Sequence, residues 1–158
     1  MTARKPLAVR MLEQRGVPHE LFQFDDRIRS AREVARVAGV PPGQVLKTLV
    51  VEPDPPKGRP LLVMMPASQD IDLKVLAASL GVKKLRMASH RDAEAQTGLK
   101  VGGISALALP GKGFAVHIEV SVLQFDVVLV SAGERGWDVR LRVADLVELT
   151  GARPIRAV

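Results

Sequence analysis

The chain has 158 residues, which is the size of one ordinary domain and enough to enclose a hydrophobic core without disulfides or metals. Hydrophobic residues make up 47% and charged residues 25%, and no apolar run is long enough to span a bilayer. The chain has no cysteine, and its start lacks the apolar run of a signal peptide. We therefore expect a single cytoplasmic domain over residues 1–158, with no membrane association.

The formal net charge is +6, because 23 Lys and Arg outnumber 17 Asp and Glu. A positive protein attracts polyanions, since neutralising phosphates releases condensed counterions. Basic residues spread over the surface of a protein that binds no polyanion would give the same net charge. Aromatic residues amount to only 3% and Tyr is absent, so the stacking platforms of single-strand binders are mostly missing. The composition disfavours a generic binder of single strands.

The predicted elements follow from apolar spacing, helix caps, and glycine and proline breaks. In chain order we expect a helix over 5–14, a strand over 19–24, a helix over 30–38, strands over 45–51 and 61–65, a helix from Asp70 or Asp72 to 80, a helix over 90–97, strands over 104–109, 114–120, 127–131 and 138–143, and a last helix over 144–149. The order has neither a strict βαβ rhythm nor an internal repeat. It predicts an α/β domain with a mixed, largely antiparallel sheet and helices packed around it.

Lys47 is the most informative single residue of the sequence. Strand alternation places it on the same face as Val45, Leu49 and Val51, a face expected to be mostly buried. A lysine there must extend to the surface, pair with a carboxylate or meet a negative charge of a ligand. On this pattern alone a structural lysine is the commoner explanation.

The other candidate motifs are short. Gly102-Gly103-Ile104-Ser105 offers consecutive N–H groups for a carbonyl oxygen or phosphate, although two glycines before a strand are more often a turn. The segment 131–138 carries Ser131 and Asp138 in a predicted hairpin tip, and no neighbouring histidine supports a serine-hydrolase triad. The three histidines lack metal-ligand spacing, and no phosphate-binding or dinucleotide-binding glycine motif is present. We expect neither a metal nor a cofactor.

Three segments together resemble the YbaK/EbsC family of aminoacyl-tRNA deacylases, which is related to the editing insertion of prolyl-tRNA synthetases. They are residues 45–50 (VLKTLV), 97–105 (TGLKVGGIS) and 130–138 (VSAGERGWD). The likeness extends over nearly the whole chain, and three segments in the right order are far more specific than any one of them. The resemblance implies a mixed sheet curled into a barrel-like core with surrounding helices.

The resemblance also assigns roles to residues. Lys47 would be the essential lysine, contacting the terminal phosphate or ribose of the tRNA acceptor end, and the Gly102-Gly103 loop would hold the aminoacyl carbonyl. Phe24 stands where several family members have tyrosine. The further residues expected at the substrate pocket are Phe24, Thr48, Ile104, Ser105, Ser131, Gly133 and Asp138.

The implied activity is trans-editing, in which a wrong amino acid is hydrolysed from tRNA. Cys-tRNA(Pro) is the preferred substrate and Ala-tRNA(Pro) the alternative. An aminoacyl ester is already activated, so the enzyme must mainly position it and stabilise a tetrahedral oxyanion. The competing hypothesis is a non-catalytic tRNA- or synthetase-binding module with the same fold.

The expected partners are the tRNA acceptor end and a prolyl-tRNA synthetase. A domain of this size cannot reach from the acceptor end to the anticodon. We therefore expect delivery by a synthetase or contacts to the acceptor stem through Lys83, Lys84, Arg86 and Lys100.

Overall fold

The structure is a computed structural model that describes residues 4–158. Residues 1–3 belong to the predicted domain and to the segment in which no signal peptide was expected, and they lie outside the described residues. The described helices are α1 (Leu7–Gln14), α2 (Ala31–Ala38), α3 (Leu73–Leu80), α4 (His90–Thr97) and α5 (Val143–Thr150). The described strands are β1 (His19–Gln23), β2 (Leu46–Pro53), β3 (Leu61–Pro66), β4 (Leu85–Met87), β5 (Ala115–Glu119), β6 (Val127–Ser131), β7 (Trp137–Arg142) and β8 (Arg153–Ile155).

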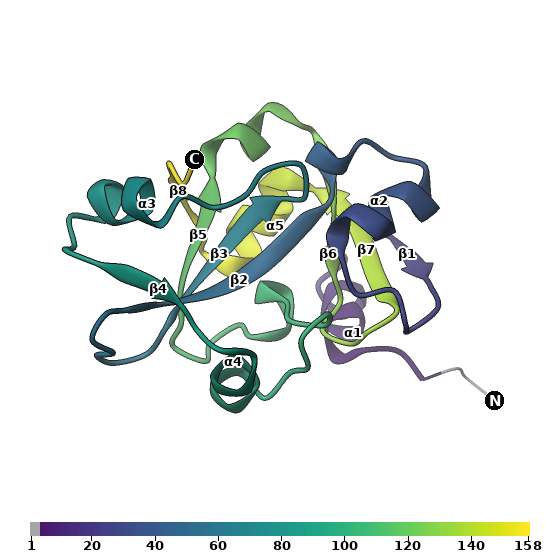
Figure 1. The fold of residues 1–158 in the computed structure, drawn as a ribbon. Helices are drawn as coiled ribbons and strands as arrows, with labels where there is room; N and C mark the ends of the chain where they lie inside the picture. The colour runs from purple at the N-terminus through teal and green to yellow at the C-terminus, as the bar shows by residue number, and fades with distance from the viewer. Residues whose placement is uncertain (1–3) are drawn as a thin grey trace.

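The strands form two sheets, which Figure 1 shows side by side. The smaller sheet has the order β1-β7-β6 and is antiparallel throughout. The larger sheet has the order β4-β2-β3-β5-β8, in which β2 is antiparallel to both neighbours and β5 is parallel to both of its own. The predicted mixed, largely antiparallel α/β arrangement is therefore confirmed.

The expected barrel-like core requires a correction, because the described residues contain two sheets and no closed barrel. The sheets meet at one isolated parallel bridge, between Val45 and Leu129. Beyond this bridge β2 runs alongside β3, and its other edge is paired with β4 only over residues 51–53. Between the bridge and β4, this second edge of β2 has no strand beside it within residues 4–158, and the two sheets diverge there.

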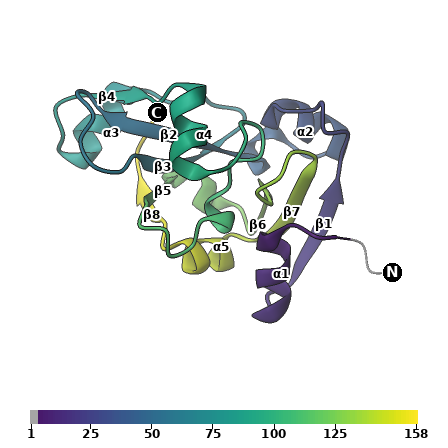
Figure 2. The same ribbon diagram turned by 90° about the horizontal axis from the view of Figure 1, so that it is seen from below.

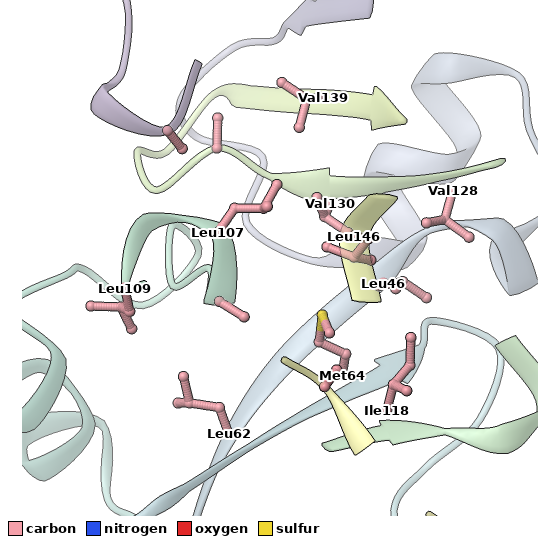
Figure 3. Close-up of a cluster of buried hydrophobic side chains, with 14 of the residues drawn as sticks. Leu46, Leu62, Met64, Leu107, Leu109, Ile118, Val128, Val130, Val139 and Leu146 are labelled. Atoms are coloured by element: carbon pink, nitrogen blue, oxygen red, sulfur yellow. The ribbon is translucent and has the colours of Figure 1, made fainter. Parts of the chain in front are cut away.

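The main hydrophobic core lies where the inner faces of the two sheets meet (Figure 3). The central side chains, all at most 4% exposed, are Leu46, Leu62, Met64, Ile118, Val128, Val130, Val139 and Leu146. Burying one such side chain contributes about 1.5–3 kcal/mol relative to leaving it exposed. Figure 2 shows α1 and α5 together on one side of the molecule, and both add side chains to this core.

The outer faces of the sheets are covered by separate helices. On the larger sheet, Leu76 and Ala77 of α3 pack against Val51, Val63 and Met65. On the smaller sheet, α2 packs in a second cluster that includes Val45 and Leu129. Both ribbon views show α2 and α3 well separated (Figures 1 and 2). Between these two helices, part of β2 reaches the protein surface.

The helix α2 begins as the sequence predicts. The Ser30 hydroxyl accepts a hydrogen bond from the Glu33 N–H at 3.1 Å, which satisfies one of the free donors at the helix start. This cap matters for the site, because the residues around it form one wall of a cavity.

None of the helices in residues 4–158 has the length and apolar character needed to cross a membrane.

The predicted strand over 104–109 is wrong. Ala106–Ala108 is instead a short 3-10 helix, and the Ser105 hydroxyl accepts the Leu107 N–H at 3.2 Å. A serine can draw the backbone into such a turn by offering it a hydrogen bond. Leu107 and Leu109 still face the core, so their burial does not need a strand. The sequence also missed β4 and β8, which have three residues each and no alternating pattern long enough to recognise.

Candidate active site

A cavity of about 350 Å³ lies along the edge of β2 that faces away from β3, over the part of this edge that no described strand covers. Its walls come from both sheets and from three connecting segments: residues 28–34 at the start of α2, residues 87–90 before and at the start of α4, and the loop 101–104. Much of the wall is apolar, including Phe24, Val45 and Ala93. The cavity is thus built from segments that are far apart in the sequence.

The open edge of β2 offers backbone hydrogen-bonding groups to this cavity. The Val50 carbonyl on this edge accepts the Ala88 N–H at 3.0 Å. Backbone groups two residues apart point to the same edge of a strand, so the N–H and C=O of Thr48 also point away from β3. Thr48 lines the cavity, and no strand in residues 4–158 pairs with it on this edge. A ligand can therefore hydrogen-bond to the strand there.

Lys47 lines the same cavity and lies between the two outer apolar clusters. Val45 belongs to the cluster under α2, whereas Leu49 packs against the cluster under α3. The Lys47 side chain is 29% exposed, and its Nζ lies 3.6 Å from Oδ1 of Asp70, whose side chain is 94% exposed. Because Asp70 is almost fully solvated, the ion pair between Lys47 and Asp70 contributes at most about 1 kcal/mol to stability. Lys47 can exchange Asp70 for an anionic ligand at little cost.

Asp138 is a buried carboxylate at the cavity wall. It lies on the central strand β7, directly opposite Phe22 of β1 and Ser131 of β6. Only 9% of the residue is exposed. Burial raises the pKa of Asp138 to about 6, and within residues 4–158 neither a hydrogen bond nor a positive charge offsets the desolvation. A buried acid at a cavity with a pKa shifted in this way is typical of functional sites.

Ser131 lies beside Asp138 at the end of β6 and also lines the cavity. Its hydroxyl accepts the Gly133 N–H at 3.2 Å, which fixes the turn into the β6–β7 hairpin. Gly133 itself does not line the cavity, and a Cβ placed on it would lie 2.7 Å from the Ala108 Cβ. Its role in the structure is therefore close packing of the hairpin against the 3-10 helix.

The two glycines of the predicted loop differ in position. Gly102 lines the cavity with a φ of +91°, a conformation that favours glycine. Gly103 does not line it: a Cβ on Gly103 would lie 2.9 Å from the backbone N of Arg135, and its own N–H donates to the Lys100 carbonyl at 2.8 Å. Gly103 lets the loop approach the β6–β7 hairpin. The candidate donor to a ligand is therefore Gly102.

The structure brings seven of the ten predicted site residues to one cavity: Phe24, Lys47, Thr48, Gly102, Ile104, Ser131 and Asp138. Gly103, Ser105 and Gly133 lie behind its wall. The sequence missed Arg29, Arg32 and His90, which also line the cavity. The capping box at Ser30 located the start of α2, but no sequence signal showed that this start adjoins β2.

The basic residues predicted to contact an acceptor stem have different surroundings. Arg86 Nε lies 2.9 Å from Glu52 Oε1, and Lys84 Nζ lies 3.3 Å from Asp54 Oδ2. Lys83 and Lys100 are exposed, and neither forms an ion pair with a residue in 4–158.

Residues 4–158 contain no group of three or more His, Cys, Asp or Glu side chains that could hold a metal ion.

Residues 25–149 match the family described as "Aminoacyl-tRNA editing domain". The match covers most of the chain, and the chain belongs to this family, the YbaK/EbsC family that its three segments predicted.

Among curated proteins the chain is similar to one from Enterococcus faecalis, provisionally named Cys-tRNA(Pro)/Cys-tRNA(Cys) deacylase EbsC. The two sequences are 35% identical over 155 residues, which is 96% of this chain and 92% of the relative.

Solved structures share the fold. One, described as the hypothetical protein APE2540, has a TM-score of 0.80 at 23% identity and matches 93% of this chain and 97% of its own. Another, described as a candidate trans-editing enzyme for prolyl-tRNA synthetase, has a TM-score of 0.78 at 22% identity and matches 99% of this chain and 100% of its own. At these identities the likeness concerns the fold alone.

Proposed function

We propose that this protein hydrolyses the ester bond of a mischarged aminoacyl-tRNA, and that Cys-tRNA(Pro) is its preferred substrate. The observation that carries the proposal is one cavity in which a cation, a buried carboxylate and an unpaired strand edge meet: Lys47, Asp138 and the backbone of Thr48. An aminoacyl-adenosine at the 3′ end of tRNA carries complementary groups. These are a phosphate, an α-ammonium, and an ester with polar oxygens.

In binding, Lys47 and Asp138 would contact different parts of the aminoacyl-tRNA end. Lys47 would leave Asp70 and contact the terminal phosphate or ribose, since its present ion pair is weak. Asp138 would pair with the α-ammonium of the aminoacyl group, which would supply the positive charge that the buried carboxylate lacks within the protein. These two contacts would hold the ester between them.

The chemical step would be attack on the ester carbonyl. A water oxygen bonds to the carbonyl carbon, the bond from that carbon to the ribose oxygen breaks, and a proton from the water passes to the ribose oxygen. The oxyanion of the tetrahedral intermediate needs hydrogen-bond donors, and the N–H groups of Thr48 and Gly102 are the candidates at the cavity. For a cysteinyl substrate the substrate thiol would attack first, as the family resemblance suggests. Its sulfur bonds to the carbonyl carbon, the bond from that carbon to the ribose oxygen breaks, and the thiol proton passes to the ribose oxygen. Water then opens the cyclic thioester and gives free cysteine.

The choice of amino acid is supported by the relative and by the wall. The name of the 35% identical relative specifies Cys-tRNA(Pro) and Cys-tRNA(Cys). Much of the cavity wall is apolar, and it includes Phe24 where several family members have tyrosine. A wall with few hydroxyl groups suits a small amino-acid side chain. Alanine is the competing substrate, because a hydrophobic pocket separates such similar groups by only about 10²-fold or less.

The test is deacylation of Cys-tRNA(Pro), Ala-tRNA(Pro) and Pro-tRNA(Pro) by the purified protein and its Lys47→Ala variant. We expect release of cysteine, slowed about 10- to 100-fold in the variant because a charge-assisted contact is lost. Lys112→Ala is the matched control, since Lys112 is exposed and does not line the cavity. It should react like the unchanged protein.

Two results would change the assignment. Faster release of alanine than of cysteine would leave an editing enzyme with the other substrate. No release from any of the three, with tRNA still bound, would support the non-catalytic tRNA- or synthetase-binding module.

A further inference from the structure

Two arginines lie against the same glycine of the cavity loop. A Cβ placed on Gly102 would be 3.2 Å from the Arg29 Cβ, 3.3 Å from the Arg29 Cγ and 3.6 Å from the Arg135 Cγ. The aliphatic parts of both side chains therefore converge on one point, although they come from the segment before α2 and from the β6–β7 hairpin. Arg29 also lines the cavity, whereas Arg135 does not.

Arg135 is fixed in place by the loop itself. Its Nε donates a hydrogen bond to the Val101 carbonyl at 2.6 Å, which leaves the two terminal nitrogens of the guanidinium for another partner. Arg29 has no ion pair or hydrogen bond from its guanidinium to any residue in 4–158. Other arginines of the described chain do have carboxylate partners, among them Arg4, Arg27 and Arg86.

Two carboxylates near Arg135 have other partners. Glu134, next to Arg135 in sequence, pairs with Arg4 at 2.7 Å. Glu94 accepts the Val101 N–H at 2.8 Å, and this bond, together with the charges of Lys100, Arg135 and His90, lowers the pKa of Glu94. No carboxylate in residues 4–158 lies within ion-pair distance of Arg29 or Arg135. Two convergent cations without an anion favour an anionic ligand.

We propose that Arg29 and Arg135 clamp one phosphodiester of the acceptor strand just outside the cavity, with Gly102 between their side chains. The inference rests on the proposed function: Arg29 lines the cavity that would hold the 3′ ester, so an acceptor strand leaving past this wall would meet both guanidinium groups. The planar guanidinium forks match phosphate oxygens in pairs, which lysines cannot do. Because Gly102 has no side chain, the aliphatic parts of both arginines can approach the loop closely.

The first experiment measures the affinity of uncharged tRNA over a range of salt concentrations, so it needs no turnover. Arg29→Gln and Arg135→Gln should each weaken binding about tenfold. The double variant should lower the slope of log affinity against log salt by about 0.7, the value for one phosphate of a single strand. Arg15→Gln, an equal loss of charge at the exposed end of α1, is the control and should bind as the unchanged protein does.

Lysine variants and a phosphate-free substrate separate the clamp from a structural role. Arg29→Lys should keep the salt slope but lose part of the affinity, because charge remains and the fork is lost. On 3′-cysteinyl-adenosine, which has no phosphodiester, Arg135→Gln should match the unchanged protein within twofold, because Arg135 does not line the cavity. An equal loss on this substrate, or an unchanged salt slope in the double variant, would overturn the clamp.

The two proposals fail differently. If the unchanged protein cleaves no aminoacyl ester while the arginine variants still lose tRNA affinity, the clamp holds and the proposed hydrolysis does not. If cleavage proceeds and the arginine variants bind tRNA as Arg15→Gln does, the hydrolysis holds and the clamp is wrong.

Discussion

Two nearly buried carboxylates, one in each sheet, have opposite surroundings. Glu119, at the end of β5, is 2% exposed and accepts the Ala157 N–H at 2.7 Å through Oε2. The Ala157 carbonyl in turn accepts the Asp72 N–H at 2.7 Å, so the C-terminal segment is tied to the start of α3. Figure 1 shows the C-terminus beside α3. Glu119 thus has its partners within the fold.

Asp138 has no such partners in the described part of the chain. It is 9% exposed, its pKa is raised to about 6 by burial, and it opens onto the cavity. Burial alone therefore does not distinguish a structural acid from a functional one. The difference is whether the protein itself supplies the hydrogen bonds that compensate for lost water. By this criterion Glu119 is a structural acid, and we propose that Asp138 is a functional one.

The largest effect should follow Glu119→Ala. The change removes the acceptor of a buried N–H and one tie of the C-terminal segment, and we expect a loss of about 3 kcal/mol in the free energy of unfolding. Urea unfolding followed by circular dichroism measures it. Glu119→Gln keeps an acceptor oxygen and should lose less. A loss below about 1 kcal/mol in the alanine variant would break the comparison.

Asp138→Asn should do the reverse above neutral pH. The ordinary pKa of 3.8 rises to about 6 in the fold, so the folded protein binds this proton more tightly than the unfolded chain does. The carboxyl therefore favours folding below about pH 4 and progressively loses that contribution as the pH rises to about 6. The asparagine variant should gain about 2 to 3 kcal/mol at pH 8 and less than about 1 kcal/mol at pH 4.

The same variant should lose deacylation, because asparagine cannot pair with an α-ammonium by charge. Stability and activity would then change in opposite directions, as happens where a residue is kept for function. Unfolding in urea at pH 4 and pH 8 and the deacylation rate at pH 8 measure both. A destabilised variant at pH 8 would show that Asp138 has a structural partner after all.

The sequence predicted much of the fold because local signals agree with the final packing. The helix caps at Ser30 and Asp72 and the alternating strands at 45–51 and 127–131 appear where expected. It failed where tertiary context decides: the segment 104–109 is apolar enough for a strand, yet the Ser105 side chain turns it into a 3-10 helix. A closed barrel also depends on strand pairing that no local pattern encodes.

The candidate site could be predicted only through its motifs. Lys47, Gly102 and Asp138 came from segments that resemble a family, and the structure places all three at one cavity. Arg29 and His90 lie in no recognisable motif, and only the folded chain brings them there. The position of Gly103 behind the wall is likewise invisible in sequence, since two adjacent glycines give no indication of which one faces a ligand.

The smallest effect extends the comparison from carboxylates to cations. Arg86 has its partners within the fold, with Nε 2.9 Å from Glu52 and Nη1 3.7 Å from Asp54, whereas Arg29 has none in the described residues. Because the Arg86 side chain is 45% exposed, Arg86→Gln should cost less than about 1 kcal/mol of stability. Its tRNA affinity should stay within about twofold of the unchanged protein, against about tenfold for Arg29→Gln. A tenfold loss of tRNA affinity in Arg86→Gln would mean that the segment 83–86 contacts the acceptor stem. It would also mean that an arginine already paired with a carboxylate of the protein can still bind tRNA.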